Sequence, residues 1–154
     1  MRRTLALVAA LAGCSDADPD GRSDTMRWFT WPNETELDGE AIAFVEDVYG
    51  MKFVREEEPV GAVTVYFDDT LEGELVAHAS AAGLSCTPHI FIRTHTPRVL
   101  AHELGHSYGL SHADDENNVM FPALEGGLEL TEDQLDEARR NAWILEEYCV
   151  DSSS

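Results

Sequence analysis

Three of the six histidines in this 154-residue chain lie within eleven residues, in the stretch HELGHSYGLSH from His102 to His112. His102 and His106 are four residues apart, so on a helix both imidazoles project from one face, one turn apart. Two imidazoles so placed can bind one Zn²⁺ at about 2.0–2.1 Å each. Glu103 is rotated away from direct ligation, but its carboxylate can reach a water molecule on the metal and take its proton.

The residues after His106 supply a third candidate ligand. Gly109 can adopt a positive φ, end the helix and turn the chain so that His112 comes back to the metal. Three protein ligands leave one coordination position for water or substrate, which is typical of a catalytic zinc site. In a chain of this length, the five fixed residues arise by chance with a probability on the order of 10⁻⁴ or less. The alternative is a polar helix whose histidines have ordinary hydrogen-bond partners.

The elements around this stretch predict one α+β domain over residues 26–150. Alternating apolar residues predict strands, the fourth of them a short edge strand, at residues 26–31, 51–55, 62–67, 74–80 and 89–93. The long irregular stretch of residues 110–130 is more often functional than accidental. This order predicts a twisted mixed sheet of four or five strands, with an active-site helix and a C-terminal helix.

Three helices are expected, each with a recognisable start or end. Thr35 with Asp38 predicts the cap of a first helix, which Gly50 ends. The motif helix is predicted over residues 97–108, with Pro97 in its first turn. A capping box begins the closing helix, and its apolar face follows at helical spacing. The box is Thr131 with Gln134, and the apolar face is Leu135, Ala138, Ala142 and Leu145.

The two ends of the chain fall outside the predicted domain. Residues 1–13 have two arginines and then an apolar run too short to span a bilayer, which is typical of a signal peptide. They end in Leu-Ala-Gly before Cys14, which resembles the lipobox of bacterial lipoproteins, where the cysteine carries the lipid. Residues 14–25 are expected to be a tether and residues 151–154 a tail. We therefore expect export to a bacterial cell envelope with a lipid anchor as the only membrane contact, or else plain secretion with an incidental cysteine.

The other cysteines are Cys86 and Cys149. Export to an oxidising compartment favours a disulfide between them, which would stabilise the fold by roughly 2–4 kcal/mol. The alternative is two buried thiols, or one regulatory thiol.

The charge of the chain excludes one class of partner. A formal net charge of -20 repels a phosphate backbone, so no nucleic-acid partner is expected. The main effect of this charge is a solvated surface. The acidic run of Asp114, Asp115 and Glu116 could bind Ca²⁺, but it does not follow an EF-hand loop, and a solvated charge run is the alternative. We expect a monomer.

The motif resembles the zinc-binding consensus of the metzincin metalloproteases. That family places a methionine turn beneath the metal, and the segment NNVMFP offers Met120, eight residues after His112. This spacing, with Pro122 two residues further on, resembles the matrix-metalloproteinase branch. The resemblance implies that Met120 packs under the imidazoles and is not a ligand, whereas the alternative is an ordinary core methionine. The resemblance is strict over residues 102–122 and looser over residues 26–148.

Some residues depart from the pattern of related metzincins. Pro122 stands where astacin-like and serralysin-like members have a tyrosine, so no tyrosine switch is expected there. Tyr108 on the motif helix is expected to pack. Matrix metalloproteinases also carry a structural zinc, but His78, His89 and His95 do not match its pattern, so we expect one zinc ion.

The resemblance implies a zinc-dependent metalloendopeptidase that acts on a protein or peptide. Its zinc ligands would be His102, His106 and His112, and Glu103 would be the base toward the zinc-bound water. The resemblance also implies that a substrate strand lies along the edge strand, expected within residues 74–82, and that residues 124–130 shape the pocket after the cut. Two alternatives stay open: a non-catalytic zinc-containing binding module, and a zinc hydrolase of a non-peptide substrate.

Overall fold

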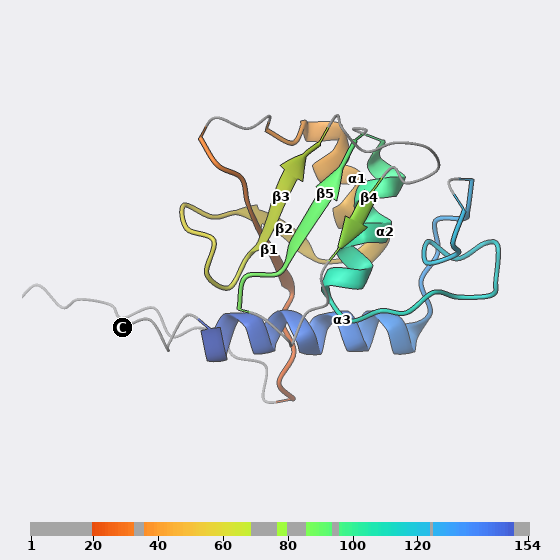
Figure 1. Ribbon diagram of the computed structural model, residues 1–154. Helices are drawn as coiled ribbons and strands as arrows, with labels where there is room; N and C mark the ends of the chain where they lie inside the picture. The colour runs from red at the N-terminus through yellow and green to blue at the C-terminus, as the bar shows by residue number, and fades with distance from the viewer. Residues whose placement is uncertain are drawn as a thin grey trace, which may run out of the picture.

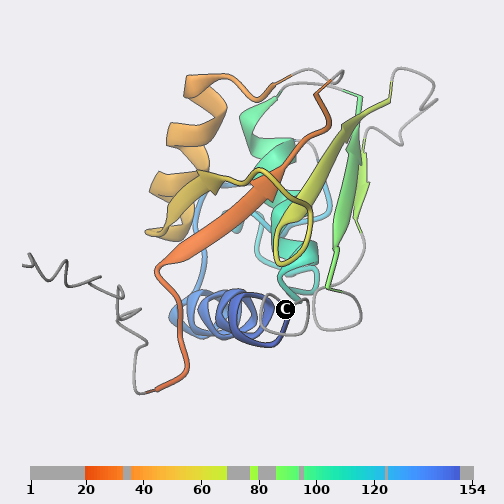
Figure 2. The same ribbon diagram turned by 90° about the vertical axis from the view of Figure 1, so that its left-hand side faces the viewer.

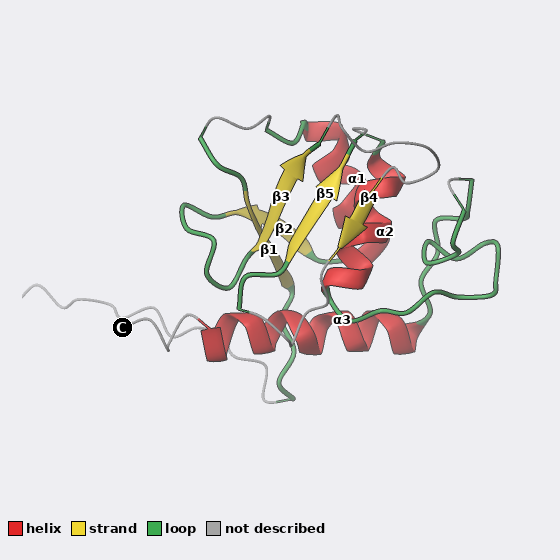
Figure 3. Ribbon diagram, viewed as in Figure 1, coloured by secondary structure: helices red, strands yellow, loops and turns green. Residues whose placement is uncertain are grey.

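A single five-stranded sheet forms the centre of the computed structural model, which describes residues 20–32, 36–68, 77–79, 86–93, 96–123 and 125–149. The strands are β1 (Thr25–Phe29), β2 (Lys52–Arg55), β3 (Val63–Phe67), β4 (Ala77–Ala79) and β5 (His89–Ile92). Their order is β2-β1-β3-β5-β4, and β4 alone runs antiparallel to its neighbour (Figure 3). The predicted α+β fold with a mixed sheet is therefore confirmed, and β4 is an edge strand of the sheet that the described residues form.

Two helices cover one face of this sheet and a third crosses its end. Helices α1 (Gly39–Tyr49) and α2 (Pro97–Ser107) lie side by side on the same face (Figures 1 and 2). Helix α3 (Glu132–Ile144) runs beneath them and continues into the π-helical turn η1 (Leu145–Cys149). None of the described helices is both long and apolar enough to cross a membrane.

The helix ends follow from local sequence. The Asp38 side chain caps α1 by accepting a hydrogen bond from the backbone N–H of Ala41 at 2.7 Å, and Gly50 ends the helix with a φ of 59°. The helix therefore begins after Asp38, while the other residue of the predicted cap, Thr35, lies outside the described residues. The capping box of Thr131 and Gln134 at the start of α3 is present as predicted.

The core lies between the sheet and helices α1 and α2. Alternate strand residues point into it and are at most 1% exposed, as the period of two predicts: Met26, Trp28, Val63, Val65, Ile90 and Ile92. Helix α2 contributes Val99, Leu100 and Leu104 to the same cluster. Because the motif helix is buried against both the sheet and α1, its orientation is fixed by the core itself.

The end of the predicted tether belongs to the fold. Ser23 is only 7% exposed, and its backbone N–H donates to the Arg139 carbonyl at 3.0 Å. Arg22 forms an ion pair with Asp136 at 3.1 Å. The expectation of a flexible tether is therefore corrected for residues 20–25, which α3 holds in place. Residues 1–19, with Cys14, and residues 150–154 lie outside the described residues.

Cys86 and Cys149 form the disulfide that export favours. The bond joins the segment before β5 to the last residue of η1, which are 63 residues apart in the sequence. It therefore closes the C-terminal end of the fold onto the sheet.

Candidate active site

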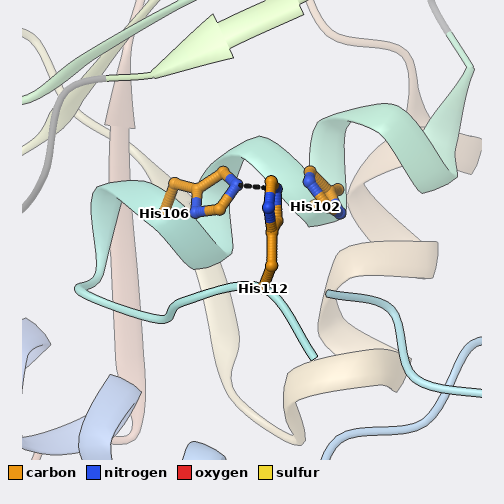
Figure 4. A group of neighbouring side chains, drawn as sticks. All are labelled: His102, His106 and His112. Atoms are coloured by element: carbon orange, nitrogen blue, oxygen red, sulfur yellow. Dashed lines mark hydrogen bonds between the residues drawn. The ribbon is translucent and has the colours of Figure 1, made fainter. Parts of the chain in front are cut away.

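The three histidines of the motif converge on one point. His102 and His106 project from α2, and His112 reaches them from the loop that follows (Figure 4). Their candidate ligand atoms all lie within 4.8 Å of one another, and the Nε2 atoms of His106 and His112 are 3.1 Å apart. Within the described part of the chain, this is the one group of three or more potential metal ligands.

The two helical imidazoles are oriented by backbone carbonyls. The Nδ1 atoms of His102 and His106 lie 2.8 Å from the carbonyl oxygens of Val119 and Leu110, respectively. A carbonyl oxygen only accepts, so each Nδ1 carries a proton and each Nε2 keeps its lone pair. Burial lowers the pKa of His106, and it lowers that of His102 to about 4. Both rings are therefore neutral at neutral pH, the form that binds a metal.

These donors fit a zinc ion. Two nitrogen atoms bound to one zinc at tetrahedral angles lie about 3.3 Å apart, given bond lengths of about 2.0–2.1 Å. The separation of 3.1 Å between His106 and His112 is close to that value. Three imidazoles without a fourth protein ligand are the donor set of a catalytic zinc site, and they leave room for water or substrate.

A sharp turn brings His112 back to the helix. Gly109 has a φ of 90°, which a side chain disfavours, and a Cβ there would lie 2.6 Å from Nδ2 of Asn141. That same Nδ2 atom donates to the Tyr108 carbonyl at 2.7 Å, so α3 supports the end of α2. The N–H of Leu110 donates to the Gly105 carbonyl at 2.9 Å and closes the turn.

Glu103 lies on the buried side of the motif. It is 8% exposed, and burial raises the pKa of its carboxyl group to about 7. A carboxyl group with a pKa near neutrality can both take and release a proton at working pH. This property suits a general base that later acts as an acid.

Met120 packs directly against the motif helix. It is fully buried, and its Sδ atom would lie 2.3 Å from a Cβ built on Gly105, so only a glycine allows this approach. The backbone N–H of Met120 donates to Oδ1 of Asn118 at 2.8 Å, and Asn118 donates from Nδ2 to Gln134 at 2.7 Å. The methionine is thus tied through Asn118 to the cap of α3.

Four supporting residues were not predicted from the sequence: Tyr49, Arg98, Asn118 and Asn141. The Tyr49 hydroxyl, for example, donates to the Ala101 carbonyl in the middle of α2 at 2.6 Å. Only the spacing of Ala41, Val45 and Tyr49 on the buried face of α1 was a signal, and it predicts burial rather than this contact. Tyr108 packs as expected, with its hydroxyl accepting from the N–H of Arg27 at 3.1 Å.

The acidic residues after His112 and the described histidine His89 are not part of the histidine group. Asp114, Asp115 and Glu116 are exposed, and they form no group of potential ligands of the kind found at the histidines. His89 lies on β5 and His78 lies on β4, while His95 is outside the described residues.

Comparison with known proteins decides the family. The protein-family model described as Matrixin matches residues 29–141, a span that contains all three histidines, Glu103 and Met120. This chain belongs to the matrixin family. The resemblance to the matrix-metalloproteinase branch of the metzincins is thereby confirmed.

A curated relative of this matrixin is an interstitial collagenase from Aquarana catesbeiana. The two chains are 52% identical over 40 residues, which is 25% of this chain and 10% of the relative. The matrixin therefore spans about a tenth of the length of that collagenase. The relative supports the family, and its collagenase activity is not transferred by so short a match.

Proposed function

We propose that this matrixin is a zinc-dependent metalloendopeptidase with one catalytic zinc ion. The observation that carries the proposal is the convergence of His102, His106 and His112 within 4.8 Å, with a buried carboxyl group at Glu103 on the same helix as the first two. A zinc ion held by the three imidazoles would polarise the scissile carbonyl and make a water molecule more acidic.

Glu103 supplies the proton transfers. Its carboxylate accepts a proton from the attacking water as the new C–O bond forms. The same carboxyl group then gives the proton to the leaving amine nitrogen as the C–N bond breaks. With a pKa of about 7, both states of Glu103 are within reach near neutral pH.

The substrate would bind as an extended strand along β4. Among the described strands β4 ends the sheet order, which favours the addition of a peptide strand at its outer edge. The described part of the predicted edge segment is residues 77–79, and residues 74–76 and 80–82 lie outside the described residues. Residues 125–130 would shape the pocket for the residue after the cut, while Leu124 is not described.

We also propose the cellular setting that the sequence predicts. The protein would be exported, lipid-anchored through Cys14 in a bacterial cell envelope, and active as a monomer on protein or peptide substrates. The disulfide between Cys86 and Cys149 supports an oxidising compartment. The net charge of -20 argues against nucleic acid as a substrate.

The direct test replaces Glu103 with glutamine, which keeps the shape of the side chain and removes its proton transfer. Glu103→Gln should bind one zinc per chain and lose about 10²–10⁴-fold in the rate of cleavage of a denatured protein. The matched control is Glu57→Gln at an exposed carboxylate, which should cleave at the wild-type rate.

Two outcomes would contradict the proposal. A Glu103→Gln variant that cleaves at the wild-type rate would remove the carboxyl group from the mechanism. A wild-type protein that binds zinc but cleaves no peptide bond would leave a zinc-containing binding module or a hydrolase of another substrate.

A further inference from the structure

Arg98 places its guanidinium group among backbone carbonyls rather than carboxylates. The residue lies in the first turn of α2, one turn before His102. Its Nε donates to the Gly126 carbonyl at 3.0 Å, and its Nη2 donates to the carbonyls of Val119 and Phe121 at 3.3 and 3.2 Å. Within the described part of the chain, the ion pairs found do not include Arg98. Its charge is therefore available to hold these three oxygens.

One of these carbonyls is shared with the metal site. The Val119 oxygen accepts from Nδ1 of His102 at 2.8 Å and from Nη2 of Arg98 at 3.3 Å. The hydrogen bond on Nδ1 sets the orientation and tautomer of a metal-binding imidazole. Whatever fixes the Val119 carbonyl therefore also fixes the direction in which Nε2 of His102 points.

The chain is shaped to admit the guanidinium group. A Cβ built on Gly126 would lie 1.8 Å from Nη2 of Arg98, so glycine is required for this contact. A Cβ on Gly127 would lie 1.8 Å from the Asn117 carbonyl oxygen. The backbone of the loop at Gly127 therefore packs closely against the backbone at Asn117. Arg98 bonds to the carbonyls on both sides of Met120 and to the carbonyl of Gly126. We call residues 119–121 and 126–127 together the methionine segment.

We propose that Arg98 is a positioning residue of the zinc site, which joins the methionine segment to α2 and holds the Val119 carbonyl that orients His102. The proposal rests on the proposed function, because it assigns His102 to the zinc. Removal of the guanidinium group should free the methionine segment and allow the His102 ring to rotate, without removing any ligand. The zinc ion should then leave faster.

The test compares Arg98→Met with Arg98→Lys in the full chain. Methionine keeps an unbranched stem and removes the donors, whereas lysine keeps the charge and part of the hydrogen bonding. Arg140→Met, at an exposed arginine of α3, is the matched control. The readouts are zinc loss to an excess of chelator and amide hydrogen exchange of the zinc-free protein.

Zinc loss should accelerate by about 3- to 10-fold in Arg98→Met, less than the 10–100-fold typical of a direct partner of a ligand, because Arg98 acts through one further group. Arg98→Lys should be intermediate and Arg140→Met unchanged. In the zinc-free protein, the amides of Val119, Phe121 and Gly127 should exchange faster in Arg98→Met. Amides of β3 should keep their rates, which separates this effect from global unfolding.

A second variant disturbs the contact between Arg98 and Gly126 by a change at the glycine. Gly126→Ala should displace the guanidinium group and accelerate zinc loss while Arg98 itself is kept. In the Arg98→Met background, Gly126→Ala should add little, because the atom with which it clashes is gone. This variant keeps the proposal testable if Arg98→Met fails to fold.

The proposal is overturned if Arg98→Met and Gly126→Ala release zinc at the wild-type rate, even if the methionine segment exchanges faster. It is also overturned if β3 amides accelerate as much as those of the methionine segment. These readouts need no peptide cleavage. A wild-type protein that binds zinc but cleaves nothing would refute the proposed function and leave the test of Arg98 intact.

Discussion

The three histidines of the proposed zinc site are held in two different ways. His102 and His106 lie on α2, and each has its Nδ1 on a backbone carbonyl at 2.8 Å. His112 is exposed and stands on the loop that leaves the helix. Its position depends on the turn at Gly109, where φ is 90°, and on the support that Asn141 gives to that turn.

This difference separates the contribution of the histidines to folding from their contribution to metal binding. The helix supplies a pair of proposed ligands that the core orients before any metal binds, because α2 is buried against α1 and the sheet. The loop supplies the third proposed ligand through its turn at Gly109, which the Asn141 side chain supports. The helical pair should therefore matter for both folding and metal, whereas His112 should matter for metal only.

The largest expected effect comes from the ligands themselves. His102→Ala and His112→Ala should each weaken zinc binding by more than about 100-fold, because even the loss of a group that hydrogen-bonds to a ligand typically costs 10–100-fold. In the zinc-free protein, only His102→Ala should lower the free energy of unfolding, since it removes a buried ring and its bond to Val119. Chelator competition and denaturant unfolding measure the two effects. Equal stability losses in the zinc-free variants would erase the distinction between helix and loop.

The next effect is the pH dependence that Glu103 gives to the stability of the zinc-free protein. Its pKa rises from an ordinary 4.5 to about 7 on burial, so between these pH values the folded protein keeps a proton that the unfolded chain has lost. The stability of the zinc-free protein should therefore fall as pH rises through this window. Glutamine does not titrate. The free energy of unfolding of Glu103→Gln, relative to that of the wild type, should therefore rise by up to about 3 kcal/mol from pH 4.5 to 8.

Denaturant unfolding of both chelated proteins across this pH range measures that difference. The lowered pKa of His102 acts in the opposite direction, but it is present in both proteins and cancels in the comparison. A constant difference between the two proteins would show that burial of the Glu103 carboxylate carries no free-energy cost.

A smaller effect is expected at the turn. Gly109→Ala places a Cβ 2.6 Å from Nδ2 of Asn141 and forces a side chain into a positive φ. We expect a loss of about 1–3 kcal/mol in the free energy of unfolding, together with weaker zinc binding. Gly39→Ala, where an added Cβ meets nothing within 4 Å, is the matched control for a glycine substitution. Unchanged zinc affinity in Gly109→Ala would show that the loop adapts around His112.

The features predicted from the sequence are those encoded by local spacing. The positions of His102 and His106 on one helix face need only the helical repeat, and the end of α1 at Gly50 needs only a residue that allows positive φ. The capping box of Thr131 and Gln134 is likewise contained in four residues. These features do not depend on which element packs against which.

The features missed from the sequence depend on tertiary contacts. Nothing near Arg98 in the sequence indicates that its partners are carbonyls 21 to 28 residues away. The composition of residues 20–25 indicates a tether, but α3 supplies the Arg139 carbonyl and Asp136 that hold them. Burial by a distant helix overrides local polarity in such a segment.

The most direct test of the central claim measures zinc content and cleavage on one sample of the full chain. We expect one zinc per chain and cleavage of a denatured protein that stops with a chelator and returns with added zinc. Zinc at one per chain without any cleavage, or cleavage that a chelator does not affect, would contradict it.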